Sequence, residues 1–145
     1  MILIEESGID INSIGFSLTL IGIDGTVKYT SKKPFETISK EGMMNLIYET
    51  IDDAIKFIDD RYVLTSIGVS CQGKVDLEHK TLIKYPFCKE IVNLNIKQLL
   101  EEKYGVHVFL EHDTNCLLED YRHRFNDEIK SVCIARVVSG IGFTI

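Results

Sequence analysis

Residues 106–125 read VHVFLEHDTNCLLEDYRHRF, and the pattern within this stretch decides the fold. The stretch opens with an apolar, β-branched run, Val106 to Leu110, which follows Gly105 and is typical of a short buried strand. After a polar break, apolar residues recur at the spacing of one helix face, at Leu117, Leu118, Tyr121 and Phe125. The sequence therefore predicts a strand that leads directly into a helix.

The polar break between them, Glu111-His112-Asp113-Thr114-Asn115, holds the candidate chemistry. Ligands of open α/β sheets bind outside the carboxyl ends of the strands, which is where Asp113 is expected. A carboxylate there can accept a proton from a hydroxyl group or hold a polyol by hydrogen bonds. Asp113, Thr114 or Asn115 would also suit the N-cap of the helix, because their side chains accept the free backbone N–H groups. Both interpretations of Asp113 stay open at this point.

Composition limits the classes of function. The 145 residues are enough for one domain with a core, and 45% hydrophobic and 26% charged residues are ordinary for a globular protein. The net charge of −6 argues against a grip on a nucleic-acid backbone. No apolar run approaches the roughly 18 residues of a membrane helix and no signal peptide is evident, so we expect a cytoplasmic protein with no membrane partner.

The cysteines lie far apart and form no C-x-x-C pair, at Cys71, Cys88, Cys116 and Cys133. This spacing favours reduced structural thiols over disulfides or a zinc site. No metal ligand is predicted in the chain.

The remaining segments predict an antiparallel meander followed by alternating helices and strands. The meander consists of residues 9–14, 15–23 and 26–30, with a hairpin turn at Asp24-Gly25. Ser39 is expected to cap a helix that runs to about Asp60. Asn95 is expected to cap a second helix, with Gln98 as its capping-box partner, and Gly105 to end it. Further strands are expected at Leu64–Cys71, Thr81–Lys84, Ser131–Val138 and, unfinished, from Phe143. The order predicts an α/β fold, a ribonuclease-H-like lobe of the actin-type ATPases, with a mixed sheet and flanking helices.

Glycine-containing turns supply two weaker candidates for binding. Asp10 precedes a turn of small residues that could approach a phosphate closely, although an ordinary hairpin turn explains the turn equally well. Gly73, in the loop that follows Cys71, would let the backbone approach a ligand or simply make a turn.

In sequence order these features resemble the N-terminal lobe of the ROK family of repressors, open reading frames and sugar kinases. The matching residues are Gly8-Ile9-Asp10-Ile11, Leu20–Val27, Ile67-Gly68-Val69, Gly73, Asp76, Tyr85-Pro86-Phe87, Leu94, Gly105-Val106-His107-Val108, Glu111–Asn115 and Gly140-Ile141-Gly142.

The resemblance implies roles for several of these residues. Asp113 matches the base that takes the proton from the sugar hydroxyl, and His112, commonly Asn in the family, matches a residue that hydrogen-bonds the sugar ring. The loop of Gly73 would close over the sugar. Gly140 and Gly142 would lie against the nucleotide phosphates, with Asp10 near them.

One departure from the family pattern bears on function. The kinases open with Asp-x-Gly-Gly-Thr, whereas the matching residues here are Asp10-Ile11-Asn12-Ser13-Ile14. Asn12, Ser13 and Ile14 remove the backbone cradle for phosphate and argue against ATP use, although the candidate base Asp113 is retained. The His-Asp pair and the segment YPFCKEIV, residues 85–92, resemble the glucose- and N-acetylglucosamine-responsive and xylose-type repressors.

The resemblance therefore predicts the sugar-sensing lobe of a transcriptional repressor of carbohydrate metabolism. The alternatives are the N-terminal lobe of an ATP-dependent, glucokinase-like sugar kinase, and an interaction module that keeps only the fold. Residues 1–145 are expected to form a single N-terminal lobe, a fragment without the winged helix that binds DNA and without the second lobe.

The same reasoning sets the expected cofactors and partners. The lobe itself is expected to hold no cofactor. ATP and magnesium belong to the kinase alternative, and a structural zinc belongs to the second lobe. A sugar or sugar phosphate would bind between two lobes, DNA would bind only through another domain, and a homo-oligomer is expected.

Overall fold

A computed structural model describes residues 3–12, 15–35, 38–58, 60, 62–125, 132–137 and 141–144. Its elements, in chain order, are β1 (Leu3–Asn12), β2 (Gly15–Gly22), β3 (Val27–Pro34), α1 (Lys40–Ile55), β4 (Tyr62–Cys71), β5 (Lys74–Asp76), β6 (Thr81–Tyr85), β7 (Cys88–Leu94), α2 (Ile96–Tyr104), β8 (His107–His112), α3 (Asp113–Phe125), β9 (Ile134–Val137) and β10 (Ile141–Thr144). Among the described residues, no helix is long and apolar enough to cross a membrane.

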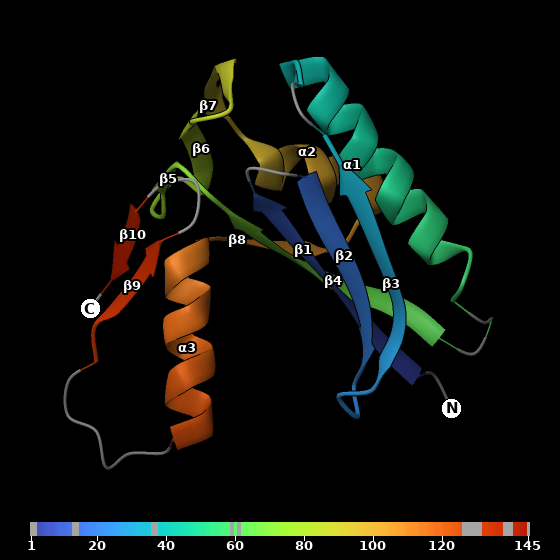
Figure 1. Ribbon diagram of the computed structural model, residues 1–145. Helices are drawn as coiled ribbons and strands as arrows, with labels where there is room; N and C mark the ends of the chain where they lie inside the picture. The colour runs from blue at the N-terminus through green and yellow to red at the C-terminus, as the bar shows by residue number, and fades with distance from the viewer. Residues whose placement is uncertain are drawn as a thin grey trace.

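A five-stranded sheet with the order β3-β2-β1-β4-β8 forms the centre of the molecule (Figure 1). Strands β1, β2 and β3 pair antiparallel, whereas β4 and β8 run parallel to β1. The predicted α/β class, with an antiparallel meander followed by parallel strands, is confirmed.

One face of this sheet is apolar because buried residues alternate along its strands. In β2, Phe16, Leu18 and Leu20 are buried and the residues between them are less so. Met43, Ile47 and Ile51 of α1 and Ile96 and Leu100 of α2 join the same core as the strand residues. The two helices therefore cover this face, and the phenol of Tyr104 in α2 ties them together by donating to Asp52 of α1 at 2.8 Å.

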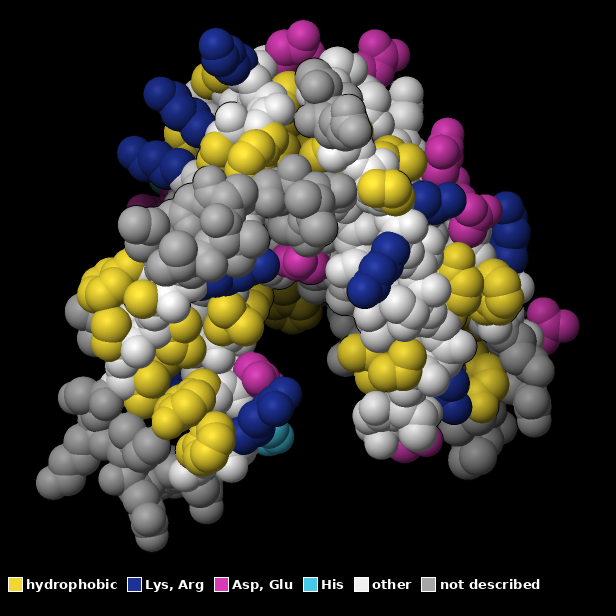
Figure 2. Space-filling model, in the orientation of Figure 1, with side chains coloured by type: hydrophobic (Ala, Val, Ile, Leu, Met, Phe, Trp, Pro, Cys, Tyr) yellow, Lys and Arg dark blue, Asp and Glu magenta, His cyan; other side chains and the backbone are white. Residues whose placement is uncertain are grey.

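The opposite face is more polar and is covered in part by α3, against which the β9–β10 hairpin packs (Figure 1). Figure 2 shows this side of the molecule hollowed between α3 and the β2–β3 side. A cavity of about 390 Å³ lies on this face, and its lining includes Gly8, Asp10, Gly68, Ser70, Phe109 and Glu111. The topology thus leaves a concave surface, lined by both polar and apolar residues, beside the strand ends that were expected to carry the site.

Several predicted boundaries are confirmed by the contacts at the helix ends. Ser39 accepts the N–H of Gly42 at 3.0 Å, and Asn95 accepts that of Gln98 at 3.0 Å. Gly105 ends α2 in the left-handed conformation, with φ of 67°.

Other boundaries were wrong. Helix α1 ends at Ile55 and not near Asp60, because Phe57 and Ile58 bond three residues back. This tighter turn carries the Phe57 ring onto Tyr29, with ring centroids 4.4 Å apart. The third strand extends to Pro34, and β9 begins at Ile134 where we expected Ser131. Strand β7 was missed entirely, and it completes a three-stranded sheet with β5 and β6.

Candidate functional site

Polar side chains from three strands form a row at the carboxyl ends of the parallel part of the sheet. The register places Asp10 of β1 beside Ser70 of β4, and Ser70 beside Glu111 of β8. The Ser70 hydroxyl donates to the Asp10 carboxylate at 3.1 Å. Because neighbouring parallel strands end together, residues distant in the sequence become one polar edge.

Asp113 follows this edge as the first residue of α3, with no loop between β8 and the helix. Its side chain is only 7% exposed. One carboxylate oxygen, Oδ1, accepts the backbone N–H of Thr114 at 2.9 Å. Asp113 thus satisfies a free N–H group of the first helical turn from within the helix and not as the preceding cap residue, and it lies directly beyond the end of β8.

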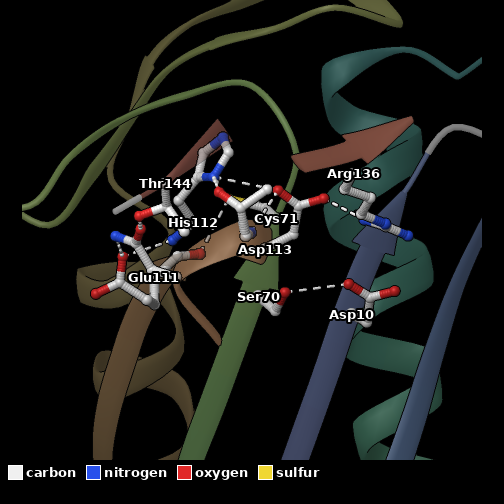
Figure 3. A network of polar contacts seen from close by, with 10 residues as sticks. Asp10, Ser70, Cys71, Glu111, His112, Asp113, Arg136 and Thr144 are labelled. Carbon is white, nitrogen blue, oxygen red and sulfur yellow. Dashed lines mark hydrogen bonds and ion pairs between the residues drawn. The ribbon is translucent and has the colours of Figure 1, made fainter. Parts of the chain in front are cut away.

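The second oxygen of Asp113 binds Arg136, which the sequence analysis did not single out. Nη1 of Arg136 in β9 donates to Oδ2, so that the two side chains form an ion pair (Figure 3). The Arg136 side chain is 28% exposed, which makes this pair partly buried. Each carboxylate oxygen of Asp113 therefore already has a donor.

His112 lies on the other side of Asp113, at the end of β8. Its Nδ1 is 2.8 Å from Thr114 Oγ1 and 3.2 Å from Asp113 Oδ1. The Thr114 N–H has both Asp113 Oδ1 and His112 Nδ1 within reach, but the bond to Asp113, at 2.9 Å, is shorter than the 3.4 Å to His112. The imidazole is thus fixed beside the carboxylate, and no partner of its other nitrogen is found within the described part of the chain.

Asn115 connects the first turn of α3 to its neighbours. Its amide donates to Glu111 at 2.8 Å and accepts the hydroxyl of Thr144 in β10 at 2.7 Å. Glu111 in turn accepts the backbone N–H of His112 at 2.8 Å. Together with the Arg136 ion pair, this network joins the hairpin to the first turn of α3 from both of its strands (Figure 3).

Cys71 lies buried at the end of β4, below this network. Burial, together with the negative charges of Asp113, Asp10 and Glu111, raises the pKa of its thiol to about 12. Their joint influence on one thiol reflects how closely the three carboxylates gather around the end of β4. A thiol in this position stays protonated and is a poor nucleophile.

The backbone conformation explains why a glycine occupies position 73. Its φ is +111°, and an added Cβ would overlap the carbonyl oxygen of Lys84 in β6. The close backbone approach that glycine permits here is therefore to β6, within the chain reversal that follows β4. A ligand role for Gly73 stays a prediction.

Only some of the residues predicted to bind phosphate belong to the described part of the structure. Asp10 belongs to the polar edge, and Gly142 lies in β10 opposite Arg136. Ser13, Ile14 and Gly140 lie outside the described residues, as does the Asn12 side chain. Among the residues that the structure describes, no group of three His, Cys, Asp or Glu side chains is arranged to hold a metal ion.

Sequence reasoning found His112, Asp113 and Asp10 but missed Ser70, Glu111 and Arg136 as members of the network. The alternation along the predicted strand Leu64–Cys71 could have placed Ser70 on the polar face beside Asp10. No comparable signal was available for Arg136, because its partner lies 23 residues earlier and the pairing depends on where the hairpin packs. The site can hold a hydroxylated ligand by a carboxylate, an imidazole and neighbouring hydroxyls.

Comparison with known proteins agrees with the resemblance seen in the sequence. A family model described as "ROK family" matches residues 6–145. An uncharacterized protein of Clostridium perfringens is 28% identical over 109 residues, which are 74% of this chain and 36% of that protein. The chain thus spans little more than a third of the length of that relative.

Two solved structures share the fold. A ROK family transcriptional regulator, a homologue of the E. coli MLC protein, superimposes with a TM-score of 0.83 at 16% identity, over 97% of this chain and 36% of that one. A ROK family glucokinase from Streptomyces griseus, in complex with glucose and AMPPNP, gives a TM-score of 0.75 at 20% identity, over 96% of this chain and 43% of that one.

Proposed function

Because this chain belongs to the ROK family, we propose that it is the sugar-sensing lobe of a transcriptional repressor of carbohydrate metabolism. The observation that carries sugar binding is the position of Asp113, buried at the carboxyl end of β8, next to His112 and at the start of α3. A carboxylate and an imidazole in this position suit the hydroxyl groups of a sugar, which both donate and accept hydrogen bonds.

The proposal includes the finer features expected from the family. The lobe has the ribonuclease-H-like topology of the actin-type ATPases, and a second lobe completes the sugar cleft and holds the structural zinc. DNA is bound through a separate winged helix, and the full protein is a homo-oligomer in the cytoplasm. The S. griseus glucokinase, whose structure contains glucose, supports sugar as the ligand class.

The loss of the kinase glycines favours a sensor over an enzyme. Phosphoryl transfer depends chiefly on positioning and on charge stabilisation of the phosphates, and Asn12, Ser13 and Ile14 stand where the kinases have Gly-Gly-Thr. The ion pair of Asp113 with Arg136 points the same way, because a carboxylate held by a guanidinium is less free to accept a hydroxyl proton.

A sugar kinase of the same family is the second candidate. The retention of Asp113 favours it, since this is the residue that matches the family's base. Turnover of glucose, N-acetylglucosamine or xylose with magnesium ATP by the full-length protein, abolished by Asp113→Asn, would establish the kinase and refute the sensor.

The test of sugar binding compares Asp113→Ala with Asp113→Asn in the full-length protein. Loss of a charged acceptor for a buried hydroxyl should weaken binding by about 1.5–3 kcal/mol, roughly ten- to a hundredfold, in calorimetric titrations with these three sugars. Urea melts of the same preparations measure the stability that each variant loses. His112→Asn, which introduces the residue common in the kinases, should retain binding but change which of the three sugars is preferred.

Taken together, the titrations and the urea melts separate the ligand role of Asp113 from the cap role. If Asp113 only caps α3, its replacement by Ala should cost about 0.5–2 kcal/mol of stability and leave every sugar affinity unchanged. That result would remove the basis for the proposed site.

A further inference from the structure

Both oxygens of the Asp113 carboxylate already hold a donor, and the side chain is largely buried before any ligand arrives. Oδ1 accepts the N–H of Thr114 at 2.9 Å, Oδ2 is held by Arg136, and the side chain is 7% exposed. A guanidinium–carboxylate bond is among the strong hydrogen bonds of proteins. Each oxygen keeps a second lone pair, but Arg136 lies against Oδ2 and little of the carboxylate is exposed, so a sugar hydroxyl gains access to Oδ2 by displacing the Arg136 donor.

Displacement of Arg136 would affect more than one side chain. Arg136 lies in β9 opposite Gly142 of β10, and the hairpin of these strands packs against α3. Among the residues that the structure describes, a weaker, neutral hydrogen bond from Thr144 to Asn115 is the other side-chain hydrogen bond between the hairpin and the first turn of α3. Without the ion pair, this neutral contact is what remains of the side-chain hydrogen bonds described between the hairpin and the first turn of α3.

We propose that Arg136 is an affinity-determining residue that competes with a ligand hydroxyl for Asp113, so that ligand binding releases the β9–β10 hairpin from the first turn of α3. The inference rests on the proposed sugar-binding function of Asp113. The form of the protein in which Asp113 is paired is not competent to bind, and the apparent affinity falls in proportion to its population. The same competition converts occupancy of the site into a change in the hairpin, which a sensor requires.

Calorimetric titration of the full-length protein with glucose, N-acetylglucosamine and xylose tests the competition. Arg136→Met keeps a side chain of similar length without the charge, and it should tighten binding about tenfold or more. Arg136→Lys retains a cation and should change affinity by less than Arg136→Met. Arg124→Met is the matched control, because it removes the same guanidinium from an exposed pair with Asp120 and should leave affinity unchanged.

Hydrogen exchange measured by mass spectrometry tests the release. Addition of the sugar to the wild-type protein should speed amide exchange in peptides that cover residues 132–144. In Arg136→Met, exchange in these peptides should be fast without sugar and should not rise further when sugar is added. If Arg136→Met does not fold, the exchange measured in the wild type with and without sugar still decides the proposal.

The outcomes separate this inference from the proposed function. Equal or weaker binding by Arg136→Met, or sugar-induced protection of the hairpin, would refute the competition while Asp113-dependent binding still stood. If Asp113→Asn leaves the affinity unchanged, or neither the wild type nor Arg136→Met binds any of the three sugars, the proposed function fails and this inference fails with it.

Discussion

The Asp113 carboxylate is buried, and the folded protein accommodates its negative charge because Arg136 pairs with it. Removal of one member of a buried ion pair leaves an uncompensated charge, which is more costly than removal of both. Arg136 is therefore expected to matter for folding as well as for ligand binding, although its partial exposure reduces the effect.

A double-mutant cycle of Asp113→Asn and Arg136→Met should reveal this dependence. Each single variant should lose stability, and the double variant should lose less than the two losses added together. We expect a coupling free energy of about 0.5–3 kcal/mol from urea melts. Additive losses would mean that the two side chains do not interact in solution.

Cys71 gives a second prediction at the residue scale, in the form of a pH dependence. Its thiol pKa is raised from 9.0 to about 12 in the folded protein, so the unfolded chain releases this proton first as the pH rises. Stability from this group is fully present below about pH 9 and is lost as the pH rises toward 12.

The measurement compares urea melts of the wild type and of Cys71→Ala at pH 8 and pH 10. Cys71→Ala should be less stable at pH 8, because it leaves a small cavity, but it should lose less stability than the wild type between the two values. Tyrosines such as Tyr104, whose pKa burial also raises, contribute equally to both proteins and cancel in the difference. Parallel losses in the two proteins would contradict the burial of Cys71 as a neutral thiol.

At the scale of the elements, side chains of α2 satisfy the backbone at the edge of the central sheet. Lys97 donates to the carbonyl of Val108 at 2.8 Å, and Glu101 accepts the Val108 N–H at 3.0 Å. Strand β8 is the last strand of the sheet order, so these bonds occupy groups that an unprotected edge would offer to another chain. The same strand ends at His112, and its fixed position helps to hold the site.

The turn after β4, which contains Gly73, gives a prediction about how tightly this turn packs against β6. Gly73→Ala should destabilise the protein by about 1–3 kcal/mol, because an alanine there combines an unfavourable φ with an overlap against Lys84. Gly25→Ala is the control, since Gly25 also has a positive φ, of 78°, but an added Cβ there meets nothing within 4 Å. Urea melts should rank Gly73→Ala as the more damaging change, and an equal cost would show that the packing against β6 is not tight.

At the scale of the whole molecule, charge determines which partners residues 1–145 can hold by themselves. The net charge is −6, with Lys and Arg contributing 16 charges against 22 from Asp and Glu. Association with a DNA backbone depends on neutralisation of phosphates by basic side chains. Where residues are described, Figure 2 shows both basic and acidic side chains on this side of the molecule.

Residues 1–145 alone should therefore not bind duplex DNA in gel-shift or fluorescence anisotropy measurements, even at about 50 mM salt, where electrostatic binding is strongest. A full-length form that includes a basic helix-turn-helix serves as the positive control. Sequence-dependent binding at nanomolar concentration by residues 1–145 would contradict the assignment of DNA binding to a separate domain.

The sequence by itself determined the elements whose signals are local. Ser39, Asn95 and Gly105 act within a few residues of a helix end, and the change of period after Glu111 marks where a strand becomes a helix. These features depend on short-range hydrogen bonding and backbone geometry, so they can be recognised without knowledge of the fold. The antiparallel meander followed by parallel strands likewise follows from the order of the elements.

Tertiary structure decided what depends on contacts between distant residues. Strand β7 escaped prediction because its buried residues, Cys88, Ile91 and Leu94, are spaced by three, and only its pairing with β6 makes it a strand. Ser70 reaches Asp10 across 60 residues, and Arg136 reaches Asp113 across 23. Such pairs form only after the strands and the hairpin have packed, because no local pattern of the chain encodes which surfaces will meet. The sequence thus supplied the carboxylate at the strand end, and the packing of the fold supplied the arginine that holds it.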